Sequence, residues 1–479
     1  MSGSALLSSV PDKNQSIDGA SQSRQQPDPN CFLSKAFGSI AILRYYCSRS
    51  HHSQETSLTL SERLHEIRTG FERPFWVANI SELFERLSYY AAFASLARYL
   101  HETLSFGVER ASSLTGLFGG LVWFLAAFGG TLADRLGFRR SLSLAYLILS
   151  CSYFLIGSIG SPWFAPVRGV VPLVVLVTFL LMLPALGVAL VKPCVVGTTA
   201  RASKENVRSI GYSIYYTLVN IGGAAGPYVA SYVHQHMSVE NVFRVSALSV
   251  FAMFFAVLIF FKEPRRADEP TVSLAQAARN FGTVLSNPRF MLFLLIFSGY
   301  WIVYWQEFII LPLYIHDYIN PKTDTELILV TGPLTVISLQ MIFSLLSQKM
   351  PAFTAITLGT LISGLAWILL IVHPTVPMAI ATLIVVSIGE ITQSPRYYEY
   401  VSRLAPPGQQ GTYMGFAFLP IGIGSLIGGK FGGMLVHHFG EVTHQPDRIW
   451  WSVMAVGVAT AALLWIYDKT LRTGGAPAK

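Results

Sequence analysis

The stretch of sequence that decides the fold reads Ser81-Glu82-Leu83-Phe84-Glu85-Arg86-Leu87-Ser88-Tyr89-Tyr90, inside an apolar segment that runs from about Pro74 to about Leu100. Residues three and four positions apart share one face of an α-helix. The charged and phenolic side chains have this spacing, so a helix would place them on one stripe: Glu82, Glu85, Arg86, Tyr89 and Tyr90. The opposite face carries apolar side chains.

The depth of this stripe within its segment indicates a function. At about 1.5 Å of rise per residue, Glu85 lies roughly 15 Å into the segment, about half the thickness of a bilayer core. Two carboxylates and a guanidinium are costly at that depth unless they face an aqueous or protein-lined interior. We therefore interpret Glu82, Glu85 and Arg86 as functional residues inside a membrane protein. The alternative is a buried charge cluster that only holds helices together.

The composition is that of an all-α polytopic membrane protein. Of the 479 residues, 52% are hydrophobic and 13% are charged, and long apolar runs recur from Phe75 almost to the C-terminus. The four cysteines have no paired spacing, so we expect neither a disulfide framework nor a metal site. The net charge of +8 is explained by basic loops beside a membrane, and we expect no nucleic-acid partner.

The hydropathy pattern predicts twelve transmembrane helices in two six-helix bundles. The predicted division is a polar, disordered N-terminal extension (1–73), an N-terminal bundle (74–261), a charged link (262–288), a C-terminal bundle (289–470) and a short tail (471–479). Lys and Arg gather in the loops on the side of the link and of both termini. Because basic loops stay inside, extension, link and tail are predicted to be cytoplasmic, in a protein of the cell membrane.

The loop between the second and third predicted spans reads Gly130-Thr131-Leu132-Ala133-Asp134-Arg135-Leu136-Gly137-Phe138-Arg139-Arg140. Gly137 can adopt a left-handed conformation, and Asp134 can pair with a cation or a helix N-terminus. The loop resembles the signature loop of the major facilitator superfamily, in which it acts as a cytoplasmic latch. That resemblance implies the major facilitator fold and gating roles for Asp134, Arg135, Arg139 and Arg140. The alternative is an ordinary basic turn.

Further motifs resemble those of the proton-dependent oligopeptide transporter family, and they occur in the expected order from about Pro74 to Phe418. They are Glu82-x-x-Glu85-Arg86-x-x-Tyr89-Tyr90, Lys192-Pro193, the run from Tyr212 to Gly222, Gly389-Glu390 with Ser394-Pro395, and Leu404-Ala405-Pro406 with the run from Gly411 to Phe416. One such motif would be weak evidence, whereas the ordered set is specific.

The resemblance implies roles for individual residues. Glu82 and Glu85 would be the proton-coupling carboxylates, and Arg86 and Lys192 would be their partners and would also attract a substrate carboxylate. Glu390 would meet a substrate amino group. The remaining pocket residues would be Tyr89, Tyr90, Asn220, Trp301 and Trp305, although an aromatic stripe such as that of the seventh span is more often packing or lipid contact than a ligand wall. Arg396 and Glu399 would belong to an inner gate, and Arg98 is expected only to reach the membrane interface.

Several positions depart from the family pattern. A basic residue of the first span is replaced by Phe93, and the seventh-span Glu that pairs with it is replaced by Trp305, so both charges are lost together. Phe118 and Ala417 replace a pocket Tyr and Trp. Glu307, two residues after Trp305, is a candidate replacement carboxylate. These changes make the expected pocket less polar and weaken the expectation of ordinary di- and tripeptide specificity.

The sequence thus predicts a proton-driven symporter that imports small peptides or similar zwitterionic or anionic solutes by alternating access. The alternatives are a carrier of a non-peptide organic anion or amino-acid derivative, and a membrane sensor built on a carrier fold. An enzyme is not expected, and neither is a cofactor. ATP is not expected as the energy source, because no phosphate-binding loop motif occurs. The expected partners are a small solute, protons and the lipid bilayer; the oligomeric state stays open, with a monomer as the default.

Overall fold

The computed structural model describes residues 69–264, 279, 282–405 and 410–472. The predicted disorder of the N-terminal extension, most of the predicted link and the end of the predicted tail therefore lie outside the described residues. The chain is helical throughout the described part, apart from turns and one isolated bridge between Phe71 and Ser203.

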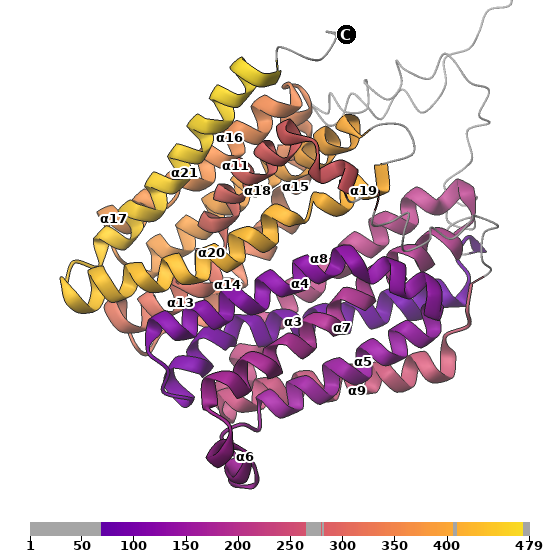
Figure 1. Cartoon of the computed structure of the whole chain (residues 1–479), viewed down its shortest axis with the longest axis horizontal. Coiled ribbons are helices and arrows are strands. Elements are labelled where there is room, and N and C mark those ends of the chain that lie inside the picture. The colour runs from indigo at the N-terminus through magenta and orange to yellow at the C-terminus, as the bar shows by residue number, and fades with distance from the viewer. Residues whose placement is uncertain (1–68, 265–278, 280–281, 406–409, 473–479) are drawn as a thin grey trace, which may run out of the picture. The chain divides into compact units, whose positions relative to one another are not determined.

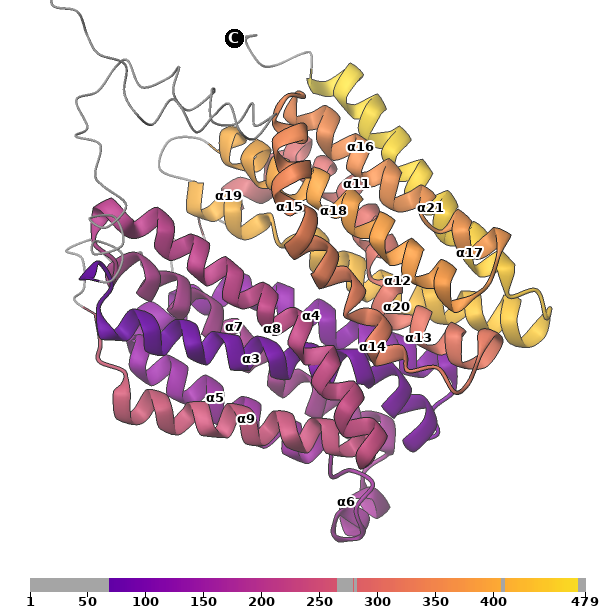
Figure 2. The same ribbon diagram turned by 180° about the vertical axis from the view of Figure 1, so that it is seen from behind.

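The first group of long helices lies side by side and is coloured indigo to pink in Figures 1 and 2. Their bounds are α3 (Arg73–Arg98), α4 (Val108–Leu136), α5 (Phe138–Ile156), α7 (Leu173–Arg201), α8 (Arg208–His236) and α9 (Val239–Phe260), and the short α6 (Ala165–Val170) lies between α5 and α7. Helix α3 packs against α7, α8 and α9, so its polar stripe lies inside the group. This contact explains how α3 can carry charges within a membrane.

The second group, orange to yellow in the same views, contains several interrupted helices. Its members are α11 (Pro288–Tyr304) with α12 (Gln306–Ile309) and α13 (Leu311–Tyr314), α14 (Thr325–Leu329) with α15 (Thr331–Gln348), α16 (Ala352–Leu365) with α17 (Ile368–Val372), α18 (Val376–Leu404), α19 (Gln410–Phe416) with α20 (Leu419–Leu435), and α21 (Asp447–Tyr467). The break between α11 and α12 falls at Trp305, one of the predicted pocket residues.

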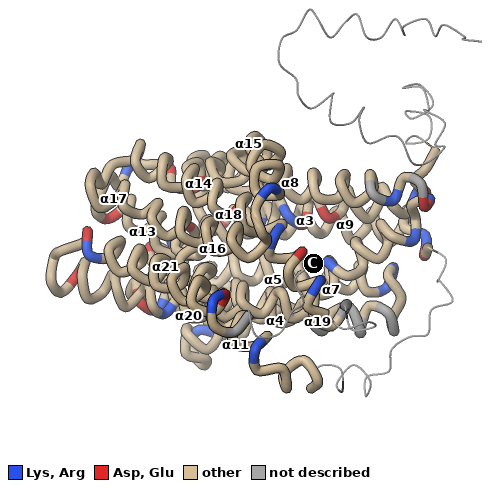
Figure 3. The backbone as a smooth tube through the Cα atoms, turned by 90° about the horizontal axis from the view of Figure 1, so that it is seen from above, with Lys and Arg blue, Asp and Glu red and all other residues tan. Residues whose placement is uncertain are grey.

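Eight helical segments of the described residues are long and apolar enough to cross a membrane. They are α7, α9, α11–α12, α14–α15, α16–α17, α18, α19–α20 and α21. The other long helices, α3, α4, α5 and α8, contain 19 to 29 residues each. The eight candidate spans confirm a multi-pass membrane protein, whereas the number of twelve spans stays a prediction. Figure 3 shows how sparse the charged residues are along the helices.

The two groups touch where α4 packs against α20. A Cβ on Gly116 would lie only 2.5 Å from the Ser425 carbonyl oxygen and 2.7 Å from the Gly429 Cα. The Ser425 hydroxyl also donates a hydrogen bond of 3.0 Å to the Gly116 carbonyl. Only glycine permits this approach, so these residues let the two backbones pack directly.

Candidate functional site

The charged residues of α3 form one buried cluster. Arg86 donates two hydrogen bonds to Glu85, from Nε to Oε2 at 2.5 Å and from Nη2 to Oε1 at 2.8 Å. The Arg86 Nε lies 3.5 Å from Glu82 Oε1, but neither Glu82 oxygen accepts a hydrogen bond from any described residue. The guanidinium also lies 4.9 Å from the Tyr89 ring centroid. The cluster therefore contains one fully paired carboxylate and one poorly satisfied carboxylate, both 0% exposed.

Polar contacts on the flank of α3 fix the rotation of this helix. The Tyr146 hydroxyl on α5 donates to the Ser81 hydroxyl at 2.9 Å. The Asn79 amide donates to the Thr199 hydroxyl on α7 at 3.2 Å. Sequence reasoning missed both contacts, because no spacing rule relates residues that far apart in the chain. They hold the stripe of α3 toward the interior of the helix group.

Lys192 lies on α7, immediately before Pro193, and contacts aromatic rings. Its Nζ lies 4.0 Å from the Trp123 ring centroid and 5.4 Å from that of Phe418. Within the described part of the chain it forms no ion pair with Glu82 or Glu85. Arg86 takes the role of carboxylate partner in this conformation, and the lysine ammonium is held by cation–π attraction.

Three further residues were predicted to line the pocket, namely Tyr89, Tyr90 and Asn220, and their polar groups make different contacts. The Tyr89 hydroxyl is buried and has no hydrogen-bond partner among the described residues. Tyr90 packs edge-on against Tyr89, with centroids 5.2 Å apart. The Asn220 amide donates to the Tyr216 carbonyl of its own helix at 2.8 Å. In this conformation the Asn220 side-chain amide therefore forms a hydrogen bond within its own helix.

An aromatic cluster joins the two helix groups beside this site. Phe93 on α3 packs edge-on against Trp305 at 5.2 Å between centroids and against Phe308 at 5.5 Å, and it lies 5.8 Å from Phe118. The Trp305 indole donates to the Ile421 carbonyl at 3.1 Å. Trp305 thus serves as packing here. The Trp301 indole nitrogen, by contrast, has no partner among the described residues, and this side chain is 8% exposed.

Glu390 on α18 borders a cavity of about 270 Å³ between α8 and the helices α15 and α18. The lining residues are Tyr216, Val336, Gln340, Glu390, Ile391, Ser394, Pro395 and Tyr398. Because Tyr216 belongs to the first helix group, both groups contribute walls. Glu390 forms no ion pair with any described residue, and the Tyr304 phenol lies close to it and to the buried Glu307. The cavity therefore offers an uncompensated acidic group.

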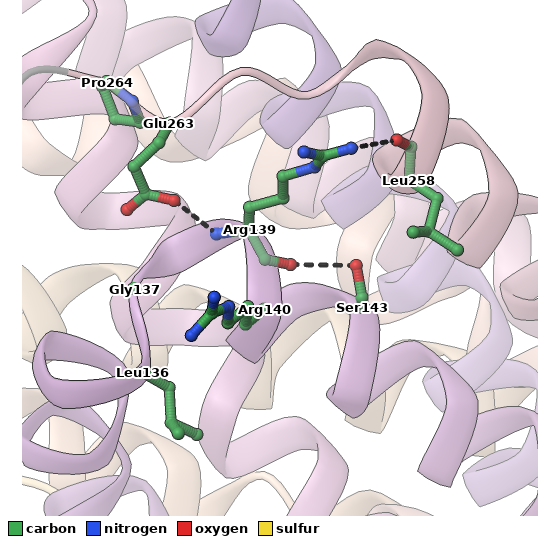
Figure 4. Close-up of a pocket in the computed structure, with 8 residues that line it drawn as sticks. All are labelled: Leu136, Gly137, Arg139, Arg140, Ser143, Leu258, Glu263 and Pro264. Atoms are coloured by element: carbon green, nitrogen blue, oxygen red, sulfur yellow. Dashed lines mark hydrogen bonds between the residues drawn. The ribbon is translucent and has the colours of Figure 1, made fainter.

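The turn between α4 and α5 forms a second, more open hollow of about 710 Å³, drawn in Figure 4. Gly137 has φ +83°, the left-handed conformation that the sequence predicts. The Glu263 carboxylate accepts hydrogen bonds of 2.8 Å from the backbone N–H groups of Phe138 and Arg139. The Arg139 guanidinium donates to the Leu258 carbonyl at 2.6 Å. Glu263 thus ties the end of α9 to the start of α5, a role that the sequence analysis missed.

The remaining predicted gating residues divide between two places. Asp134 and Arg135 lie in α4, but their side chains lie outside what the structure describes, whereas Arg140 is exposed beside the hollow. Arg396 and Glu399 form an ion pair on α18, and Arg396 also donates to the Met350 carbonyl at 2.8 Å. The pair follows Pro395, which lies inside α18, and its assignment to an inner gate stays a prediction.

The sequence analysis expected Arg98 only to reach the membrane interface, and the structure shows that this expectation is wrong. The Arg98 side chain is 9% exposed and lies 3.2 Å from Glu326, at the start of α14 in the second helix group. It therefore joins the two groups and does not simply reach for a membrane interface. The acidic partner is more than 200 residues away in sequence, so no local pattern could identify it.

Two groups of long apolar helices, with buried charges and an acidic cavity between them, define a multi-pass membrane protein of the two-bundle carrier class. The family model described as Major Facilitator Superfamily matches residues 78–419 and 308–477, so the chain belongs to this superfamily.

Relatives and solved structures agree with this assignment. The chain is 23% identical over 342 residues to the multidrug resistance protein MdtH of Klebsiella pneumoniae, covering 71% of this chain and 81% of that protein. It is 25% identical over 353 residues to the uncharacterized MFS-type transporter YttB of Bacillus subtilis, covering 72% and 82%. A crystal structure of a POT family transporter in complex with 5-aminolevulinic acid has a TM-score of 0.69 and 18% identity, covering 83% and 96%. The POT family transporter PepTSo has a TM-score of 0.69 and 16% identity, covering 84% and 99%. These two structures share its fold.

Proposed function

We propose that this protein is a proton-coupled symporter of the oligopeptide transporter family, which imports small peptides or related zwitterionic or anionic solutes. The observation that carries the proposal is the buried cluster of Glu82, Glu85 and Arg86, which shares the interior of the protein with Glu390. Tyr90 on α3 lies within electrostatic range of both Arg86 and Glu390. An acidic and a basic recognition group thus lie on opposite helix groups, as a zwitterion requires.

Proton coupling follows from the contacts of Arg86. An ionised Glu85 holds the guanidinium through two charge-assisted hydrogen bonds. A protonated Glu85 cannot accept both bonds from a cation, so protonation frees Arg86 to bind a substrate carboxylate. Lys192 supplies a second cation when it leaves the rings of Trp123 and Phe418. Proton and solute then favour the same conformation, which is the thermodynamic requirement for coupling.

The cycle would be alternating access in the cell membrane, with both termini cytoplasmic. In that orientation the closed contact of Gly116 with Gly429 lies toward the outside, and the hollow bordered by Glu263 lies toward the cytoplasm. The bundles would be residues 74–261 and 289–470, which rock about the central site. Asp134, Arg135, Arg139, Arg140, Arg396 and Glu399 would act at the cytoplasmic gate.

A non-peptide solute is a second candidate, and the contact between Phe93 and Trp305 favours it. An ion pair at that place would leave polar groups beside the site, whereas these rings make one wall apolar. The POT structures that share this fold include one in complex with 5-aminolevulinic acid and one in complex with a thioalcohol conjugated peptide. An amino-acid derivative would satisfy the same two charged groups as a peptide.

The test is uptake into proteoliposomes with and without an inward proton gradient. Labelled dipeptide and labelled 5-aminolevulinic acid would be offered separately, with a neutral sugar as control solute. Gradient-stimulated uptake of the dipeptide supports peptide import, and stimulation of 5-aminolevulinic acid alone supports the second candidate. A well-folded protein that binds a solute but shows no driven flux for a broad panel would contradict transport and favour a sensor.

A further inference from the structure

A second charged cluster lies at the far end of α3, twelve residues beyond Arg86, or roughly 18 Å along the helix. Arg98 Nη1 donates to Glu326 Oε2 at 3.2 Å, and His234 Nδ1 lies 3.0 Å from Glu326 Oε1. The Arg98 Nε also binds Glu102 at 2.8 Å. Glu326 is 1% exposed, so its buried carboxylate is held between a guanidinium from α3 and an imidazole from α8.

A second connection lies beside this cluster. Asp324, which precedes α14, accepts hydrogen bonds from Ser231 and from the Gln235 amide, the latter at 2.5 Å. Helices α3 and α8 belong to the first helix group, and α14 belongs to the second. The cluster therefore joins the two groups on the side where Gly116 meets Gly429, and opening that side requires these contacts to break.

Histidine is the side chain that changes charge between about pH 5 and 8. His234 is 24% exposed, so water reaches it even in the closed state. Glu326 on α14 contacts it directly, and Arg98 at the end of α3 pairs both with Glu326 and with Glu102 of the π-helix Tyr99–Thr103. Asp324, immediately before α14, accepts a hydrogen bond from the neighbouring Gln235, and His316 of the π-helix Ile315–Ile319 lies 3.9 Å from Glu102. Without the histidines these groups carry one positive and three negative charges, a formal sum of −2. An added proton on His234 is compensated here and strengthens its contact with Glu326.

Buried aromatic rings pack against α3 between Arg86 and Arg98. Phe93 on α3 contacts Trp305, at the break between α11 and α12, and Phe308 on α12, and all three side chains are at most 5% exposed. His234, in contrast, is partly exposed, so in the closed state protons reach it from its own side of the protein. In the opposite state, in which this side is open, the residue faces the same solution.

We propose that His234 is a second proton-binding residue, which stabilises the closed outer gate when protonated and exchanges protons only with the outside. It makes gate closure depend on external pH without adding a transported proton. The assignment of the outside rests on the proposed function, whereas the gate itself requires only alternating access. The proposal separates two proton sites, the coupling cluster around Glu85 and a gate site that senses the acidity of the medium.

The test uses His234→Gln, which keeps a side-chain amide for Glu326 but cannot bind a proton. The control is His236→Gln, because His236 is an exposed histidine on the same helix whose contacts within the described part of the chain are the Tyr232 carbonyl and ring. Spin labels at Met237 and Lys322, in a background without the native cysteines, would report the separation of α8 from the α14 side in nanodiscs.

The expected result is a wild-type distance distribution that shifts toward the closed separation as pH falls from about 8 to about 5.5. A proton that binds one state tenfold more tightly changes the ratio of states by up to about tenfold. His234→Gln should reduce the shift to the contribution of the Glu85 cluster, whereas His236→Gln should retain the whole shift. A shift in His234→Gln as large as in the wild type would overturn the proposal. This measurement needs no substrate, so it is independent of whether peptides are transported.

A second measurement separates gating from coupling. In proteoliposomes with fixed internal pH, His234→Gln should flatten the dependence of uptake on external pH and leave the reversal potential, which reports the number of coupled protons, unchanged. A changed reversal potential would show that the His234 proton is transported, which would contradict its assignment to the gate. The solute for this measurement is whichever one the wild type accumulates.

Discussion

Phe93 on α3 and Trp305 at the break between α11 and α12 face each other across the two helix groups, with ring centroids 5.2 Å apart. The resemblance identified these positions as those of a family ion pair. Their contact explains why both charges are replaced together, because a single remaining charge would be buried without a partner. A charged connection between the two groups lies farther along α3, between Arg98 and Glu326.

Reintroducing one charge at this contact should destabilise the protein. Phe93→Arg places a guanidinium among rings that offer no carboxylate, and an unpaired buried charge costs about 3–5 kcal/mol. The double variant Phe93→Arg, Trp305→Glu should recover most of the lost thermal stability in detergent. A double variant that is no more stable than Phe93→Arg alone would show that the two residues do not form a pair.

The two carboxylates of α3 should differ in their structural contribution. Glu85→Gln breaks a bidentate contact with Arg86, in which each charge-assisted hydrogen bond is worth about 1.5–3 kcal/mol. Glu82 accepts no hydrogen bond from the described residues, so Glu82→Gln should lower the melting temperature less. Thermal unfolding followed by tryptophan fluorescence compares the two. Equal losses would mean that the Glu85 contact is not the dominant one.

Lys192 should contribute to solute binding more than to stability. Lys192→Met keeps an unbranched side chain that packs against Trp123 and Phe418. Because no ion pair is broken, the melting temperature should change little. Affinity for carboxylate-bearing solutes should fall about tenfold or more, since a charge-assisted hydrogen bond is worth about 1.5–3 kcal/mol. Methyl esters of the same solutes, which lack the carboxylate, should bind both proteins equally, and an equal loss for the esters would contradict this role.

Glu263 should stabilise the start of α5. Removal of a capping carboxylate typically costs about 1 kcal/mol, so Glu263→Ala should raise amide hydrogen exchange at Phe138 and Arg139 several-fold. Glu205→Ala, which changes an acid in another loop of the same helix group, is the control. Exchange at α5 that stays at the wild-type level would show that the carboxylate does not hold this turn.

Much of the fold could be predicted from the sequence, because apolar length and periodicity are local properties. The stripe of α3, the left-handed Gly137 and the position of Pro395 in α18 all follow from residues close together in the chain. The proximity of Phe93 to Trp305 also followed, through the family resemblance.

The missed features depend on residues that are far apart in sequence. The contact of Arg98 with Glu326, the capping of α5 by Glu263 and the aromatic contacts of Lys192 require the helices to be packed. The charge of Lys192 suggested a carboxylate partner, but Arg86 is adjacent to Glu85 in the chain and takes that place. Sequence patterns identify which side chains need partners, and packing decides which partners they receive.

The central claim, that Glu85 couples protons to solute movement, is tested most directly by comparing driven uptake with counterflow in Glu85→Gln proteoliposomes. Counterflow exchanges labelled for unlabelled solute and needs no net proton movement. We predict that gradient-driven accumulation is lost in the variant while counterflow persists, and that the exposed control Glu441→Gln retains both. Gradient-driven accumulation at the wild-type level in Glu85→Gln would contradict the account.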